Sequence, residues 1–200
     1  MESRVKVAGH PVHPMLIVFP LGLLATAVIF DLIALVSHAS RWTEVAYYLI
    51  GAGVIGGLAA AVPGWIDWFA IPRRTRAKRI GLLHGIGNVL VLVLFATSWL
   101  LRRDNPAVPP TGAIVAGLLG IVLGTVTGWL GGELVGRLGI GVDDGAHLDA
   151  PSSLSALPAG AAGSAPSRPG TSASFGGVDR RGFPQPAYAG VERRRASPRP

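Results

Sequence analysis

The chain has 200 residues, half of them hydrophobic and only 14% charged, with a formal net charge of +7. This balance excludes an ordinary soluble domain and is typical of an integral membrane protein. The absence of cysteine excludes disulfide bonds, thiolate-held iron–sulfur clusters and cysteine nucleophiles. Any bound metal would therefore be held by histidine and carboxylate side chains.

Four apolar runs follow one another at about residues 15–36, 45–66, 80–101 and 111–134. Each has roughly 20 residues, the length of a helix that crosses a hydrocarbon core about 30 Å thick. Because backbone polar groups find no partners in lipid, these runs must be helical. Short connections make successive helices antiparallel neighbours. The sequence therefore predicts an all-α membrane protein with four transmembrane helices in an up-down-up-down bundle.

The membrane domain is expected to comprise residues 1–142. From Asp143 the composition changes to Ala, Pro, Ser, Gly and Arg, with few large apolar side chains. Such a segment cannot bury enough surface to offset its ordering entropy. We therefore predict that residues 143–200 form a disordered cytoplasmic tail, which either stays solvated or rests its basic end on anionic lipid.

Basic residues are distributed unequally between the two sides of the predicted bundle. Within residues 1–142, eight lie on the side of the N-terminus and three on the other side. The positive-inside rule then predicts a protein of the inner (plasma) membrane with both termini in the cytoplasm. We interpret the basic segment 73–79 as a topology determinant beside anionic headgroups. It is short and lacks aromatic stacking partners, so nucleic-acid binding is excluded.

Six polar residues gather at one end of the predicted bundle. In an alternating topology, the starts of helices one and three share a membrane face with the ends of helices two and four. Polar groups at membrane depth are costly and usually face a bundle interior or a functional cavity. We call these six residues the polar cluster: His10, His13, Asp67, His84, Asn88 and Glu133.

His13 and His84 are the candidate ligands of a haem b iron. Histidine commonly holds haem iron, and helices one and three are diagonal across a four-helix bundle. The two histidines, with Asp67 and Glu133, are alternatively the ligands of a non-haem iron or zinc ion. A third interpretation is a structural histidine bonded to a polar neighbour. The candidates for supporting hydrogen bonds or alternative ligation are His10, Asp67, Asn88 and Glu133.

Asp31 lies about 27 Å along its helix from His13, at 1.5 Å per residue, and so belongs to the opposite leaflet. It cannot share the histidine site. We interpret it as bonded to a neighbouring helix, and the alternative is the far-side acid of a proton path.

Helix four carries a small residue at every fourth position. Small residues at this spacing let helix backbones approach closely in lipid, so we predict that the ladder packs against neighbouring helices. The alternative is that its glycines leave room for a flat cofactor. The ladder consists of Gly112, Ala116, Gly120, Gly124, Gly128, Gly132 and Gly136.

Several segments over about residues 8–142 resemble one bacterial family, the small membrane proteins of domain of unknown function 2231. Some relatives are joined to a Rieske-type iron–sulfur domain, so the resemblance implies membrane electron transfer, with this chain as the membrane half. The matching segments are Gly-His-Pro-Val-His-Pro at 9–14, Phe-Pro-Leu-Gly at 19–22, Gly-Trp-Ile-Asp at 64–67, His84 with Asn88, and Gly-Trp-Leu-Gly-Gly-Glu-Leu-Val at 128–135.

Three functions are compatible with these observations. The first is a redox or metal-binding membrane domain, most concretely with haem b and an electron-transfer partner. The second is a structural or assembly partner without a site of its own. The third, a small transporter or proton channel, is disfavoured by few mid-membrane polar groups and the lack of an internal repeat, unless the chain forms a homo-oligomer. In every case the surrounding partner is the lipid bilayer.

Overall fold

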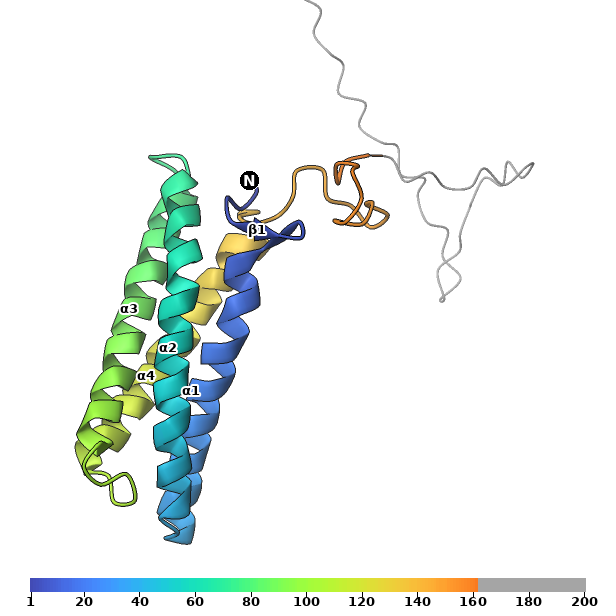
Figure 1. Cartoon of the computed structure of the whole chain (residues 1–200). Helices are drawn as coiled ribbons and strands as arrows, with labels where there is room; N and C mark the ends of the chain where they lie inside the picture. The colour runs from blue at the N-terminus through green and yellow to red at the C-terminus, as the bar shows by residue number, and fades with distance from the viewer. Residues whose placement is uncertain (162–200) are drawn as a thin grey trace, which may run out of the picture. The chain divides into compact units, whose positions relative to one another are not determined.

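The computed structural model describes residues 1–161. Two short strands precede four helices: β1 (Lys6–Val7), β2 (His10–Pro11), α1 (Val12–Ser37), α2 (Arg41–Ala70), α3 (Arg76–Arg102) and α4 (Thr111–Gly136) (Figure 1). All four helices are long and apolar enough to cross a membrane. The predicted all-α architecture is therefore confirmed. Of the predicted tail, residues 162–200 lie outside the described residues.

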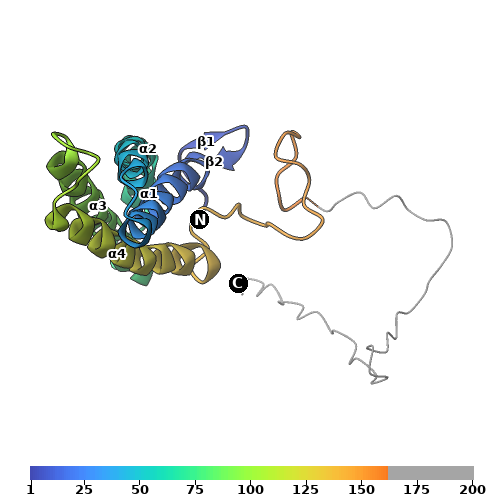
Figure 2. The ribbon, with the colours of Figure 1, turned by 90° about the horizontal axis from the view of Figure 1, so that it is seen from below.

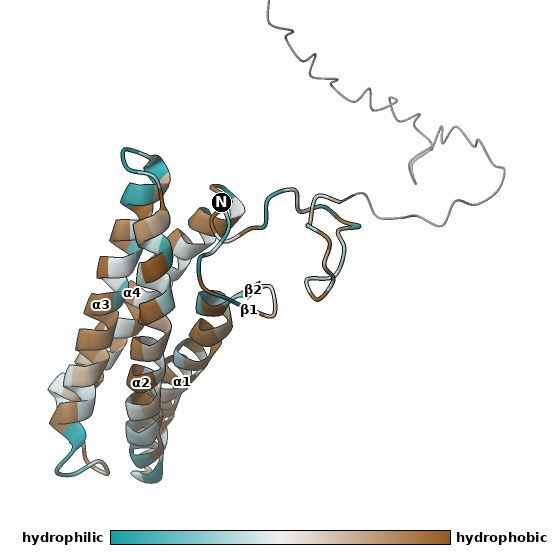
Figure 3. Ribbon diagram, turned by 45° about the horizontal axis from the view of Figure 1, so that its top comes forward, coloured by the Kyte–Doolittle hydropathy of each residue, from teal (hydrophilic) through white to brown (hydrophobic). Residues whose placement is uncertain are grey.

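The helices form two antiparallel hairpins. Figures 1 and 2 show α1 beside α2 and α3 beside α4. The connection between α2 and α3 lies at the same end of the bundle as the N-terminus, and the connection between α3 and α4 lies at the opposite end (Figure 1). We call the end of the bundle that carries the N-terminus and the α2–α3 connection the histidine end. Both α1, which contains His13, and α3, which contains His84, begin there. Hydrophobic residues dominate the middle of the helices, and hydrophilic residues gather at the connections (Figure 3).

Each of the first three helices extends beyond its apolar run at both ends. The first run was expected to begin near residue 15, whereas α1 begins at Val12, and the third was expected near residue 80, whereas α3 begins at Arg76. Hydropathy detects only the part of a helix that contacts lipid hydrocarbon, and polar turns continue into the interface. At the start of α3, the Thr75 hydroxyl accepts a hydrogen bond from the Lys78 amide (3.1 Å). This capping bond fixes where α3 begins.

Within each hairpin, large side chains of the core pack against glycines of the neighbouring helix. A Cβ atom on Gly53 of α2 would lie 2.6 Å from Leu24 Cδ2, and one on Gly120 of α4 would lie 2.8 Å from Phe95 Cε2. Only glycine admits these contacts without a shift of the neighbouring side chain. The buried core residues are Leu24, Ala27, Val28, Ala46, Ile50, Val91 and Phe95.

The prediction that the whole α4 ladder packs against neighbouring helices is wrong. Gly120 packs against Phe95, but a Cβ on Gly128, Gly132 or Gly136 would meet no atom within 4 Å. An α-helix has 3.6 residues per turn, so each four-residue step advances about 40° beyond a full turn. The ladder therefore winds from the bundle interior to the outer surface of α4.

A buried ion pair joins the two hairpins at the end opposite the histidines. Arg102 Nη1 and Nη2 donate to Asp31 Oδ1 and Oδ2, each at 2.7 Å, and the two residues are 0% and 2% exposed. Arg102 Nε also donates to Ser98 Oγ (3.3 Å), whose hydroxyl donates to the Ala113 carbonyl (2.7 Å). The expectation that Asp31 bonds to a neighbouring helix is confirmed. Arg102 is one of the three basic residues counted on the side opposite the N-terminus. Its role as the partner of Asp31 was not predicted from the sequence.

Candidate cofactor site at the histidine end

His13 lies in the first turn of α1 and is held against α2. Its Nδ1 is 2.8 Å from the Ala60 carbonyl, and its ring lies on Gly64, where a Cβ would come within 2.8 Å of Nδ1. A carbonyl oxygen only accepts, so Nδ1 carries the hydrogen. In the neutral imidazole this leaves the lone pair on Nε2, the atom that would bind a metal.

His84 is held against α4 in the same way. Its Nδ1 donates to the Thr127 carbonyl (2.8 Å), and a Cβ on Gly131 would lie 3.0 Å from its Cε1. Asn88, one turn along α3, donates to the His84 carbonyl (2.8 Å) and accepts from the Thr127 hydroxyl (3.1 Å). The amide nitrogen of Asn88 is also 3.3 Å from His84 Nε2. The ring of His84 is therefore positioned from both α3 and α4.

The two imidazoles lie next to each other between the hairpins, in a T-shaped arrangement. Their ring centroids are 6.3 Å apart, and the rings are nearly perpendicular, at 88°. Metal–imidazole bonds are about 2 Å long, so two rings that bind opposite sides of one ion have centres roughly 6 Å apart. The structure thus brings His13 and His84 together, and their centroid spacing is compatible with a shared ion.

The other members of the polar cluster have different partners. Asp67 accepts from the Ser3 hydroxyl and the Arg4 amide, both at 2.6 Å, and Glu133 accepts from Arg76 (2.6 Å). His10 lies 3.1 Å from the Ser153 hydroxyl. Residues 1–161 contain no group of three or more histidine and carboxylate side chains placed to hold a metal ion. The structure therefore gathers His13, His84 and Asn88, and the ligand assignments stay predictions.

An N-terminal segment that sequence reasoning missed lies at the histidine end. Strands β1 and β2 pair antiparallel through a turn at Ala8 and Gly9, both of which have positive φ. Gly9 was the sequence signal that could have predicted this turn. The N-terminal ammonium donates to the Gly139 carbonyl (3.0 Å). Together with the bonds to Asp67, this contact ties the segment to the ends of α2 and α4.

A charged network continues from this segment past the end of α4. Lys6 forms ion pairs with Glu2 (2.7 Å) and with Asp143. The bond to Asp143 raises the pKa of Lys6, and the bond from Lys6 lowers the pKa of Glu2. Ordered contacts therefore continue beyond residue 142, where the membrane domain was expected to end.

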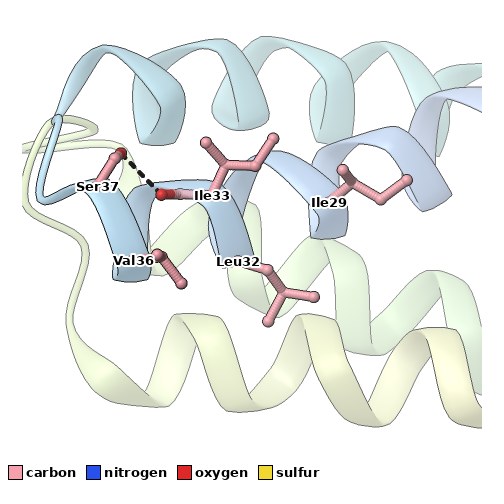
Figure 4. A pocket seen from close by; sticks show the side chains of 5 residues that line it. All are labelled: Ile29, Leu32, Ile33, Val36 and Ser37. Carbon is pink, nitrogen blue, oxygen red and sulfur yellow. Dashed lines mark hydrogen bonds between the residues drawn. The ribbon is translucent and has the colours of Figure 1, made fainter.

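The structure also has an apolar hollow at the far end of α1. Its only polar side chain, Ser37, donates to the Ile33 carbonyl (2.7 Å), so the hollow offers no free polar group to orient a ligand (Figure 4). We interpret this surface as contacting lipid. It is lined by Ile29, Leu32, Ile33, Val36 and Ser37.

A family model described as predicted membrane protein, DUF2231, matches residues 9–144. The chain belongs to this family. The DUF2231 match spans all four helices and both inward-facing histidines, and it confirms the resemblance at the level of the family. Neither the curated proteins nor the solved structures yielded a match to the chain. Membership in DUF2231 establishes a membrane protein that lies in a lipid bilayer.

Proposed function

We propose that this DUF2231 protein is a redox membrane domain in which His13 and His84 would hold the iron of a haem b. The observation that carries the proposal is the pair of imidazoles with centroids 6.3 Å apart. Each ring donates its Nδ1 hydrogen to a carbonyl of the neighbouring helix. Metal-binding histidines characteristically make this bond, because it fixes the tautomer and aims the other nitrogen at the metal.

The number of available side chains favours haem over a bare metal ion. A structural zinc ion takes four protein ligands, whereas a haem iron already has four porphyrin nitrogens and takes two more from the protein. The described residues offer two converging imidazoles and no third histidine or carboxylate within reach. Basic residues at the start of α3 lie at the same end as the two histidines, and their positive charge would favour the propionates of a haem. A non-haem iron or zinc ion is the alternative occupant.

An absorption spectrum and a metal analysis of the purified full chain test this proposal. We expect a Soret band and iron in the wild type, and their loss in His13→Ala and in His84→Ala. His38→Ala is the matched control, because His38 is exposed at the opposite end of α1 and should keep the band. A wild-type protein without haem after expression with haem supplied would overturn the haem assignment. Bound zinc or iron without a Soret band would favour the non-haem alternative.

A second candidate, a structural membrane partner without a cofactor, is favoured by one observation. Within residues 1–161, every buried side-chain nitrogen and oxygen has a hydrogen-bond partner. The histidines would then act only as links between helices. In that case His84→Ala would lower the melting temperature and leave the spectrum and the metal content of the protein unchanged.

A further inference from the structure

The first helices of the two hairpins are equivalent at a spacing of 71 residues. His84 follows His13 by 71 residues, and Arg102 follows Asp31 by the same number. Between them, Leu-Leu-Ala-Thr-Ala at 23–27 corresponds to Leu-Phe-Ala-Thr-Ser at 94–98. Burial agrees, since positions 20, 24, 27 and 31 in α1 and positions 91, 95, 98 and 102 in α3 are all buried. The expectation that the chain lacks an internal repeat is therefore wrong.

The second helices are equivalent at a spacing of 67 residues. Ala60 and Thr127 supply the carbonyls that accept from the two histidines. Gly64 and Gly131 lie under the same two imidazole rings. Gly53 and Gly120, also 67 residues apart, lie against Leu24 and Phe95, which are themselves equivalent. Equivalent residues therefore make equivalent contacts in the two hairpins.

Two of the contacts between hairpins join a residue to its own equivalent. His13 meets His84 at one end of the bundle, and Asp31 meets Arg102 at the other. In a twofold arrangement, a residue that meets its equivalent lies at the axis. A pseudo-twofold axis therefore runs along the bundle through both contacts. Repeats with parallel topology in membrane proteins are related by an axis of this kind, along the membrane normal.

We propose that the bundle is a duplicated helical hairpin in which the axial face of each hairpin is an interaction surface for the unlike hairpin. Asp31 and Arg102 are the residues that distinguish the two surfaces. A hairpin facing a copy of itself would bury two aspartates or two arginines, and like charges without counter-charges are strongly disfavoured in the membrane. A hairpin facing its unlike partner buries a neutral pair. The two charges thus disfavour the pairing of a hairpin with a copy of itself.

The hydroxyl of Ser98 is an asymmetry beside this pair. It accepts from Arg102 Nε, and its equivalent in α1 is Ala27, beside the acidic position. The serine hydroxyl at this position is therefore present only on the helix that carries the arginine. An exchange of the two charges between the hairpins has to move this hydroxyl as well.

Charge exchange in the full chain tests the proposal. The single reversals Asp31→Arg and Arg102→Asp each place two like charges at the axis. We expect each to lower the melting temperature in detergent by on the order of 10 °C, or to prevent membrane insertion. The fourfold variant Asp31→Arg, Arg102→Asp, Ala27→Ser and Ser98→Ala restores the pair with its hydroxyl. We expect this variant to recover insertion and most of the lost melting temperature.

A control and a distance measurement complete the experiment. The control carries only Ala27→Ser and Ser98→Ala, and we expect it to lose less stability than either reversal. Because the native chain has no cysteine, spin labels on cysteines introduced at exposed His38 and Asp104 report the separation of α1 and α3. We expect the same distance in the wild type and in the fourfold variant. A fourfold variant as unstable as the single reversals would show that positions 31 and 102 are not equivalent and would overturn the proposal.

Discussion

The ring of Phe95 in α3 packs onto the backbone of Gly120 in α4, so closely that a Cβ at that glycine would lie 2.8 Å from the ring. The helices α3 and α4 thus meet where α3 presents a large aromatic ring and α4 presents a glycine, which has no side chain. The contact distinguishes Gly120 from other glycines of the α4 ladder that have the same sequence spacing.

Gly120→Leu should destabilise the bundle, whereas Gly128→Leu should not. The first side chain would have to displace Phe95, and overpacking a core costs about 1–3 kcal/mol or more. The second would enter open space on the outer surface of α4. Thermal unfolding of both variants in the same detergent checks the difference. Equal destabilisation by the two substitutions would contradict the winding of the ladder.

Asp31→Asn should be strongly destabilising. The substitution keeps the size of the side chain but leaves the fully buried Arg102 guanidinium without a counter-charge, and breaking a buried pair in this way costs about 3–5 kcal/mol. Glu44→Gln is the control, because Glu44 is an exposed acid at the same end of the bundle. A melting temperature unchanged by Asp31→Asn would mean that the pair contributes nothing to folding.

Asp67→Ala should release the N-terminal segment. The carboxylate accepts from the Ser3 hydroxyl and the Arg4 amide, and its removal leaves both donors without that partner. We expect faster hydrogen exchange at the Arg4 amide with little change in the unfolding of the helices. Glu133→Ala, which removes an acid bonded to Arg76, should leave exchange at Arg4 unchanged.

The ionisation of Glu2 offers a test by pH. Its pKa is lowered chiefly by the bond from Lys6, so the stabilising contact is present above the ordinary pKa of glutamate. The contact is lost as the pH falls through the lowered value. The amide of Asp144 donates to Glu2 (3.1 Å), and its NMR chemical shift should follow this titration. In Lys6→Gln we expect the midpoint of the Glu2 titration to move to higher pH. An unchanged midpoint would show that a group other than Lys6 lowers the pKa of Glu2.

Reporter fusions test the orientation of the bundle. A reporter between α2 and α3, at residues 71–75, and one between α3 and α4, at residues 103–110, should lie on opposite sides of the membrane. The excess of basic residues predicts that the first lies in the cytoplasm. The reverse pattern would place the histidine end outside and would exclude a cytoplasmic electron-transfer partner.

Hydropathy was sufficient to predict the four helices and their order, because the hydrocarbon core imposes one length and one backbone structure on each span. Alternating topology was also sufficient to place His13 and His84 at one end. The carbonyl partners of these rings could not be predicted, since Ala60 and Thr127 contribute backbone atoms that any residue carries. Asp67 and Glu133 were predicted to join the site; in the structure Asp67 accepts from Ser3 and Glu133 accepts from Arg76.

The pairing of Asp31 with Arg102 was predictable in part. A lone acid within an apolar run requires a partner, and Arg102 closes a helix at the same end. The spacing of 71 residues and the repeated Ala-Thr were the signals that could have identified the partner. They were weak because most aligned positions of the two hairpins differ.

The neutrality of the Asp31–Arg102 pair also bears on how the bundle responds to the transmembrane voltage. A single charge that crosses the membrane field exchanges about 2.3 kcal/mol with each 100 mV. The carboxylate and guanidinium are bonded at 2.7 Å, and together they carry no net charge. Movement of the pair as a unit therefore exchanges almost no energy with the field. The two hairpins should stay joined equally well in an energised and in a depolarised membrane.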